Sequence, residues 1–174
     1  YRYIRNRPVF REAPAGSPIS PNLAGRDAAA FAMCFQLYKA SDPAFANRCL
    51  LAAEHIFDLA NTSPKGDLLT VGPFDFYGET EWRDDMELGA SQLSLALMSA
   101  GGRLPSTLPH TDPRFYLRRA AHWAHAYIAG PNDASDTLNL YDVSGLAHFE
   151  LIRAMKTAGH PKDLEVSQAD LVRD

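Results

Sequence analysis

The chain has 174 residues, of which 46% are hydrophobic and 22% are charged, and this composition excludes an intrinsically disordered protein. Its 17 basic and 21 acidic residues give a formal net charge of −4, so we expect no basic surface for nucleic acid or anionic lipid. No apolar run approaches the roughly 18 residues that a membrane-spanning helix needs. A single domain with neither a nucleic-acid nor a membrane partner is therefore predicted.

An extended arm precedes the first helical pattern. Residues 1–21 contain four prolines with Gly and Ser between them, and this composition favours extended chain over helix. From Asn22, the expected N-cap, apolar residues recur at steps of three and four and predict a helix. We therefore assign residues 22–174 to a helical domain. The expected apolar stripe of the first helix consists of Ala24, Ala28, Phe31, Phe35 and Tyr38.

The rest of the chain predicts five more helices. The second starts with Asp42 as N-cap and Pro43 at the first helical position, where the missing N–H of proline costs nothing. No strand pattern of any length is present, so the chain is predicted to be all-α. The remaining helices are expected at about Thr80–Ala100, from Asp112 and Pro113 to about Ala129, from Asp142 to about Ala158, and after Pro161.

A sequence repeat relates the second and fourth of these helices. The stretch Ser-Asp-Pro-Ala-Phe at 41–45 matches Thr-Asp-Pro-Arg-Phe at 111–115, and Arg48 matches Arg118 at the same offset of 70 residues. The six helices thus pair into three successive hairpins. A period of 70 residues exceeds the roughly 33–47 residues of common helical solenoids. An α/α toroid is therefore favoured over an open solenoid or a bundle.

The two cysteines, Cys34 and Cys49, lie at equal distances from the turn at Ser41 and Asp42, so both occupy the same level of the first hairpin. Packed helix axes are roughly 8–10 Å apart, whereas a disulfide needs Cα atoms within roughly 7 Å of each other. Free buried thiols are therefore the expected state, with a disulfide as the alternative. Both positions lie mid-helix on or beside the apolar face, which speaks against a catalytic thiol.

The segment 72–90 is rich in acidic and aromatic residues. One interpretation is structural, because acids in the first turns of a helix complement its dipole, each by roughly 0.3–1 kcal/mol. The aromatic side chains then serve only to fill the core. Six carboxylates lie within thirteen residues, accompanied by four aromatic rings: Asp75, Glu79, Glu81, Asp84, Asp85 and Glu87, with Phe74, Phe76, Tyr77 and Trp82.

A metal site is the second interpretation of this segment. In an array of hairpins the first, third and fifth helices run in the same direction, so their N-termini lie at one end. This arrangement brings Asp84 or Asp85 near Asp142, with loop carbonyls beside them. Carboxylates and carbonyls without soft ligands suit a hard cation, and a flexible site favours Ca²⁺ over Mg²⁺.

Three motifs carry a resemblance to a known family. They are Asn-Leu-Ala-Gly-Arg-Asp-Ala-Ala-Ala-Phe-Ala at 22–32, Trp-Arg-Asp-Asp-Met-Glu-Leu-Gly-Ala at 82–90, and Tyr-Asp-Val-Ser-Gly at 141–145. In this order and spacing they resemble the central part of glycoside hydrolase family 9, the cellulase family, over most of residues 20–174. The resemblance implies an (α/α)6 barrel of twelve helices, of which three hairpins form about half. It also implies that residues 1–174 are a piece of a longer enzyme.

A structural calcium ion is implied by the same resemblance. The family's ligands come from a helix start and from an aspartate in a later turn. Thr80 keeps the expected hydroxyl and Asp85 keeps the carboxylate, whereas Glu81 replaces a glycine. This set contains only oxygen ligands, in agreement with the hard cation expected from the residue types. The matching positions in this sequence are Thr80, Glu81, Asp84, Asp85 and Asp142.

The resemblance further implies an inverting hydrolase of β-1,4-linked glucan. Such enzymes use an Asp base from an Asp-x-Gly-Asp motif and a Glu acid that follows Asn, and inversion needs the two carboxyls roughly 6.5–9.5 Å apart. Neither motif occurs in this chain, so no catalytic residue is assigned. We expect the chain to be inactive alone and to have the remainder of its own catalytic domain as its partner.

Phe76, Tyr77 and Tyr141 are expected at the cleft end, where aromatic faces stack on the sugar rings of a polysaccharide substrate. Cellulose, mixed-linkage glucan, xyloglucan and an amino sugar all stay open as substrates. The resemblance implies a secreted enzyme, although residues 1–7 are not followed by the apolar stretch of a signal peptide. The alternative function is a non-enzymatic helical-repeat module that binds a partner through the same end.

Overall fold

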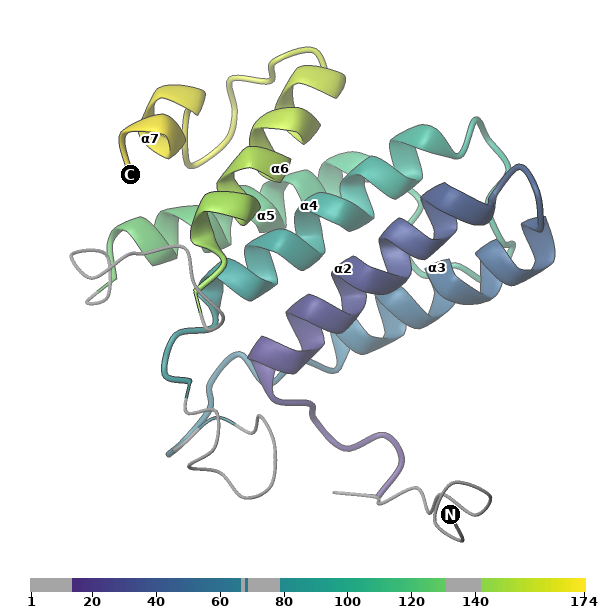
Figure 1. Ribbon diagram of the computed structural model, residues 1–174, viewed down its shortest axis with the longest axis horizontal. Coiled ribbons are helices and arrows are strands. Elements are labelled where there is room, and N and C mark those ends of the chain that lie inside the picture. The colour runs from purple at the N-terminus through teal and green to yellow at the C-terminus, as the bar shows by residue number, and fades with distance from the viewer. Residues whose placement is uncertain (1–13, 67, 69–78, 131–141) are drawn as a thin grey trace, which may run out of the picture.

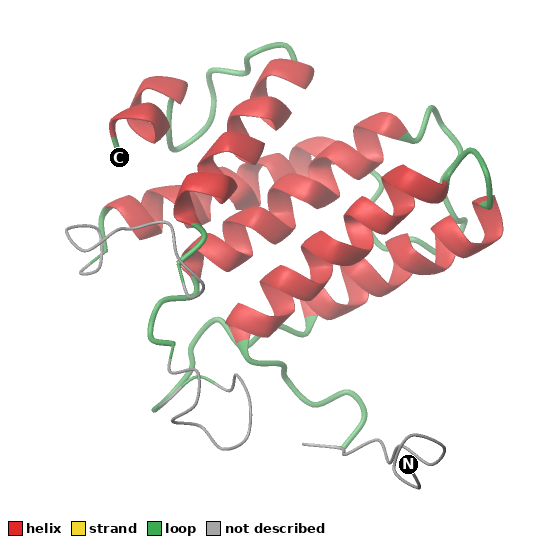
Figure 2. Ribbon diagram, in the orientation of Figure 1, coloured by secondary structure: helices red, strands yellow, loops and turns green. Residues whose placement is uncertain are grey.

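The computed structural model describes residues 14–66, 68, 79–130 and 142–174. In this part of the chain all regular structure is helical, apart from an isolated parallel bridge between Ile19 and Ala60 (Figure 2). The all-α prediction is confirmed, and none of the described helices has the length and apolar character needed to cross a membrane. The helices are α2 (Pro21–Tyr38), α3 (Pro43–Asp58), α4 (Arg83–Ser99), α5 (Pro113–Ile128), α6 (Ser144–Thr157) and α7 (Gln168–Arg173).

These helices form two layers. In the inner layer, α4 lies between α2 and α6 and contacts both (Figure 1). In the outer layer, α3, α5 and α7 each pack on the inner helix that precedes them in the chain. Three α/α hairpins in two layers are the arrangement of an α/α toroid, so this prediction is also confirmed.

The two copies of the sequence repeat form the same local structure. Helices α3 and α5 both have 16 residues and both have proline in the first turn. The carboxylate of Asp42 accepts a hydrogen bond from the backbone N–H of Phe45 at 2.9 Å, and that of Asp112 accepts one from Arg114 at 2.9 Å. Both predicted N-caps are therefore correct, because an aspartate satisfies a free N–H of the first turn and proline has none to satisfy.

The starts of α2 and α7 differ from the predictions. The N-cap of α2 is Ser20, and Asn22 lies inside the first turn. Asn22 does not cap the helix because its side chain binds Glu79, which is 57 residues away in the sequence. Helix α7 begins only at Gln168, where Ser167 and Asp170 form a reciprocal capping box.

The helices α4 and α6 also begin later than predicted. Helix α4 begins at Arg83 instead of Thr80, and α6 begins at Ser144, two residues after Asp142. The carboxylate of Asp142 still accepts a hydrogen bond from the backbone N–H of Ser144, at 3.0 Å. The residues directly before both helices therefore belong to loops that contact neighbouring elements, and this shortens the helices.

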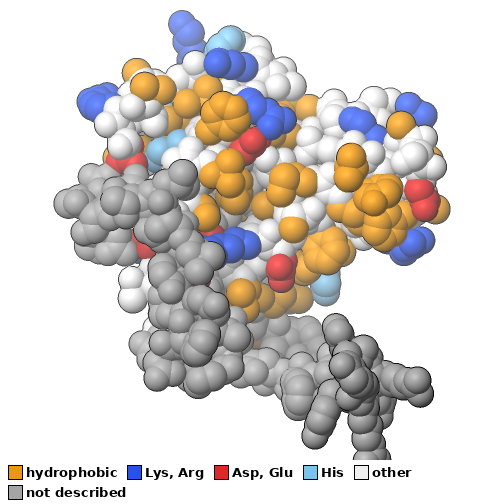
Figure 3. Space-filling model, viewed as in Figure 1, with side chains coloured by type: hydrophobic (Ala, Val, Ile, Leu, Met, Phe, Trp, Pro, Cys, Tyr) orange, Lys and Arg blue, Asp and Glu red, His pale blue; other side chains and the backbone are white. Residues whose placement is uncertain are grey.

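Alanines dominate the buried face of α2. Phe35 is buried together with Ala24, Ala28 and Ala32, as predicted for three of these four. The prediction is wrong for Phe31 and Tyr38, which are 38% and 39% exposed. Small side chains suit this face because α3 and α4 both pack against it. Figure 3 shows hydrophobic side chains exposed along α2 and α6, among which Leu37 and Phe149 are the most exposed of those two helices.

Cys34 and Cys49 form a disulfide that joins α2 to α3, with their Cα atoms 6.0 Å apart. The expectation of free thiols is therefore wrong. It compared the spacing of helix axes with a limit that applies to Cα atoms. Cα atoms lie about 2.3 Å from the axis of their helix, so facing Cα atoms of helices packed at an ordinary distance are close enough for a disulfide.

The crossing of α2 and α4 is a contact between backbones. A Cβ atom added to Gly25 would lie 2.3 Å from the carbonyl carbon of Asp85, and one added to Gly89 would lie 2.7 Å from the carbonyl oxygen of Gly25. Neither position accepts a side chain without displacing a helix. The two glycines thus determine how closely the N-terminal halves of the inner helices approach.

Candidate functional site

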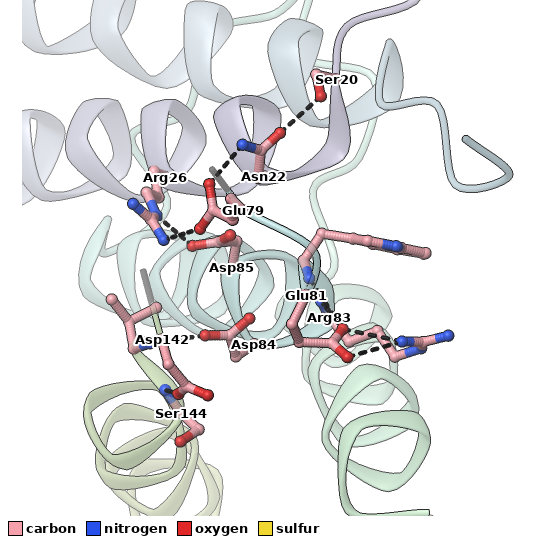
Figure 4. Close-up of polar contacts among 12 residues, drawn as sticks. Ser20, Asn22, Arg26, Glu79, Glu81, Arg83, Asp84, Asp85, Asp142 and Ser144 are labelled. Carbon is pink, nitrogen blue, oxygen red and sulfur yellow. Dashed lines mark hydrogen bonds and ion pairs between the residues drawn. The ribbon is translucent and has the colours of Figure 1, made fainter. Parts of the chain in front are cut away.

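The N-terminal ends of α2, α4 and α6 meet at one end of the inner layer, as the hairpin arrangement predicts. Figure 4 shows the polar side chains that gather there from the three helices and the loops before them. Four of these carboxylates are buried, namely Glu79, Glu81, Asp84 and Asp85. We call this group of residues, together with Asp142, the acidic end.

Arg26 joins α2 to the acidic end. Its guanidinium donates through Nε to Oδ1 of Asp85 and through Nη2 to Oε1 of Glu79. The other oxygen of Glu79 accepts a hydrogen bond from Nδ2 of Asn22 at 2.6 Å, and Asn22 in turn accepts one from the hydroxyl of Ser20 at 2.6 Å. Through these hydrogen bonds, Glu79 in the segment before α4 is bound to the N-terminal part of α2.

Asp84 joins α4 to α6. Its Oδ2 atom accepts a hydrogen bond from the backbone N–H of Val143, the N-cap of α6, at 2.7 Å. Asp142 completes this junction, because its carboxylate accepts one bond from the N–H of Ser144 at 3.0 Å and one from the hydroxyl of Tyr127 at 2.8 Å. The predicted approach of Asp84 and Asp142 is confirmed.

Glu81 faces away from these two junctions. It accepts hydrogen bonds from the backbone N–H groups of Trp82 and Arg83 and from the guanidinium of Arg83, all at 2.9 Å. The Arg83 guanidinium also lies 5.2 Å from the ring centroid of Trp82, whose ring contacts Trp123 at 5.1 Å. Glu81 therefore completes the start of α4, and Thr80 beside it is exposed.

Burial raises the pKa of three carboxyls at the acidic end. Burial and the nearby charge of Asp142 raise the pKa of Asp84 to about 6, although the N–H of Val143 lowers it. Burial and the charge of Asp84 also raise the pKa of Asp85, against the opposing effect of Arg26, and burial raises that of Glu79. In the described part of the chain, Oδ1 of Asp84 and Oδ2 of Asp85 are buried without a hydrogen-bond partner.

The structure brings the five predicted calcium ligands to the same end without forming a shared shell. Asp85 is bound to Arg26, Glu81 to Arg83, and Asp84 to the start of α6. Within the described ranges, no group of three or more His, Cys, Asp or Glu side chains is arranged to hold a metal ion. The residues present thus do not fit a ready-made calcium site, and calcium stays a prediction of the resemblance.

Phe76, Tyr77 and Tyr141, the predicted sugar-binding aromatics, lie outside the described residues, as do Phe74 and Asp75. The prediction for them stays as it was. Most of the predicted arm, residues 1–13, lies outside them as well.

Arg26, Asn22 and Glu79 form the network that sequence reasoning missed. The available signal was the pair Gly25-Arg26 inside the first motif. A glycine within a helix often marks the point where another backbone packs against that helix, and the residue after the glycine then lies beside this contact. That signal does not identify the partner, which is 59 residues away from Arg26 in the case of Asp85.

A second buried ionic group joins α4, α6 and α7. Nδ1 of His148 lies 2.8 Å from Oε1 of Glu87, and its Nε2 lies 3.0 Å from Oδ2 of Asp174. The side chains of Glu87 and His148 are 0% and 5% exposed. Burial lowers the pKa of His148, but the two carboxylates outweigh this and raise it to about 9. An imidazolium between two carboxylates therefore holds the end of the second and third hairpins together.

Paired α/α hairpins in two layers define an α/α-toroid protein. Comparison with known proteins makes this more specific: the chain matches the model of glycosyl hydrolase family 9 over residues 2–158. The chain belongs to this family, which consists of cellulase-type glycoside hydrolases with polysaccharide substrates. Searches of curated proteins and of solved structures found no match to this chain.

Proposed function

We propose that the chain builds part of the substrate cleft of an inverting, endo-1,4-β-glucanase-like hydrolase. The match to the family over residues 2–158 carries this proposal. The acidic end supports it, because the inner helices place their N-termini and the loops before them together, and cleft-forming loops gather at one end of such a toroid. Other β-linked polysaccharides are the alternatives that the binding experiment below separates.

The catalytic acid and base belong, in this proposal, to the remainder of the catalytic domain. Inversion needs two carboxyls with a water between one of them and the sugar. The carboxylates of the acidic end are poorly suited to this role, since Asp84, Asp85 and Glu81 bind protein donors and are buried. Their role is to hold the loops in place, and Phe76, Tyr77 and Tyr141 supply the surfaces on which sugar rings stack.

We also propose that the protein works outside the cell. The disulfide between Cys34 and Cys49 supports this location, because disulfides persist in oxidising compartments and are rare in the cytosol.

Affinity electrophoresis tests the proposed substrate class. The full chain is run in native gels that contain hydroxyethylcellulose or barley β-glucan, with pullulan, an α-linked glucan, as the control polymer. We expect retardation by the β-linked polymers only, and weaker retardation for Tyr77→Ala and Tyr141→Ala. Tyr38→Ala is the matched control, since Tyr38 is a partly exposed tyrosine at the opposite end of α2.

Equal retardation in pullulan, or retardation that neither cleft tyrosine changes, contradicts the proposal. Absence of any retardation favours the non-enzymatic repeat module, which the repeated α3 and α5 helices and the missing catalytic motifs support. Hydrolysis of carboxymethylcellulose by the chain alone, at a rate that survives repurification, contradicts the assignment of the acid and base to another part of the enzyme.

A further inference from the structure

We propose that the guanidinium of Arg26 is the built-in cation of the acidic end, and that it competes with divalent metal ions for the carboxylates of Asp85 and Glu79. This inference does not depend on the polysaccharide substrate. It assigns to an arginine of the chain the neutralising role that the family resemblance gives to calcium.

The contacts of Arg26 occupy carboxylate oxygens that a metal ion bound to Asp85 and Glu79 would need as ligands. Its Nε and Nη2 atoms bind one carboxylate oxygen each of Asp85 and Glu79, whose side chains are 0% and 4% exposed. A calcium ion needs such oxygens as direct ligands, at roughly 2.3–2.6 Å. The oxygens that face the guanidinium are therefore not available to a metal while Arg26 is present.

Backbone geometry holds Arg26 in this place. Gly25 touches the backbone of Asp85 at the crossing of α2 and α4, so the adjacent Arg26 starts close to its partner. Glu79 is held from the other side by Asn22 at 2.6 Å. The guanidinium thus makes two charge-assisted bonds with little loss of side-chain freedom, which favours it over a diffusing ion.

Charge at the acidic end supports the same conclusion. The guanidinium of an arginine is not deprotonated in proteins. Arg26 therefore stays charged wherever the protein is folded. A divalent cation at the same carboxylates would meet strong repulsion from this guanidinium in a largely buried setting.

Removal of Arg26 should create a metal site. The two carboxylates would lose their cation, and Oδ1 of Asp84 and Oδ2 of Asp85 already lack a partner among the described residues. The buried carboxylates of Asp85 and Glu79 would then lack a compensating charge. A hard cation that accepts six to eight oxygen ligands supplies this charge.

The test compares calcium binding by the metal-free full chain and by Arg26→Gln, measured by calorimetry and by the shift of the melting temperature. We expect Arg26→Gln to bind calcium at least tenfold more tightly than the unmodified chain. Arg26→Lys, which keeps the charge, should bind no better than the unmodified chain.

Arg83→Gln is the matched control. Arg83 lies at the same end, its side chain is 30% exposed against 31% for Arg26, and it also binds a buried glutamate. The two substitutions change the net charge equally, so a gain of affinity confined to Arg26→Gln supports competition for Asp85 and Glu79. An equal gain in Arg83→Gln contradicts the proposal, because it would reflect only the general negative potential.

Asp85→Asn in the unmodified chain tests the proposal without removing Arg26. If Arg26 holds Asp85, any weak effect of calcium on the melting temperature should be the same in Asp85→Asn. A calcium effect that this substitution abolishes shows that Asp85 is a metal ligand beside Arg26, and it overturns the proposal. None of these measurements uses a polysaccharide, so failure of the proposed function does not affect them.

Discussion

Aspartates at the hairpin turns differ from aspartates at the acidic end in their burial and in how far away their hydrogen-bond partners are in the sequence. Asp42 and Asp112 are exposed and bind backbone N–H groups two or three residues away. Asp84 and Asp85 are fully buried, and each binds a partner 59 residues away. The first pair builds the same local structure in the first and second hairpins, whereas the second pair joins different helices and occurs at one end only.

The two kinds of aspartate therefore differ in how much the folded structure depends on them. An exposed cap contributes about 1 kcal/mol and tolerates replacement. A buried carboxylate needs all its partners in place, because removal of one partner leaves a charge or a polar atom uncompensated. Substitutions at the helix crossing should therefore destabilise the protein more than substitutions at the exposed caps.

Gly25→Ala tests whether backbone contact between α2 and α4 positions the acidic end. The added Cβ would lie 2.3 Å from the backbone of Asp85, so the free energy of unfolding should fall by about 3 kcal/mol. Urea denaturation measures this. Gly145→Ala is the control, since a Cβ there has no atom within 4 Å, and its effect should be below about 1 kcal/mol. Similar losses in both variants would contradict a special role for the crossing.

Reduction of the disulfide tests the contact between α2 and α3, which the hairpin turn alone does not secure. The bond closes a segment of 15 residues, for which the chain-entropy model gives a stabilisation of about 3 kcal/mol. The Cys34→Ser, Cys49→Ser double variant should lose about this amount in urea denaturation. It should also show no further change with a reducing agent. An unchanged midpoint after reduction of the unmodified chain would show that helix packing suffices.

Stability should fall as the pH rises from about 6 to 9, because of the buried group around His148. The folded-state pKa of His148 is raised to about 9 from 6.5, so its contribution is complete below 6.5 and is lost as the pH passes 9. The total loss should be on the order of 2–3 kcal/mol.

His148→Gln should flatten this part of the pH profile, measured by urea denaturation at several pH values. His122→Gln is the control, because His122 is half exposed and contacts Glu165 on the surface. Parallel profiles for the unmodified chain and His148→Gln would mean that the buried histidine is not the group that titrates.

Asp42→Ala and Asp112→Ala should have the smallest effects, about 1 kcal/mol each. Because the two caps are equivalent members of the repeat, the losses should agree within a few tenths of a kcal/mol and should add in the double variant. Thermal or urea denaturation measures both. Unequal losses would show that the two hairpins, although alike in local structure, differ in how firmly the rest of the molecule holds them.

Local sequence was sufficient for the elements whose partners are close in the chain. The Asp-Pro starts of α3 and α5, the all-α class and the pairing into hairpins follow from caps, periodicity and the repeat, all of which act within a few residues or recur at a fixed offset. The meeting of Asp84 with the start of α6 was also predictable, because parallel inner helices place their N-termini at one end.

Tertiary structure alone decided the features that depend on how closely helices approach. The sequence does not state that Cys34 and Cys49 face each other across α2 and α3, or that Gly25 lets Arg26 reach Asp85. Exposure of Phe31 and Tyr38, and the use of Asn22 to bind Glu79 instead of capping α2, have the same origin. Cys34, Arg26 and Asn22 each have a partner 15 or more residues away. No local pattern identifies such a partner, because it is the packing of the helices that decides which side chains meet.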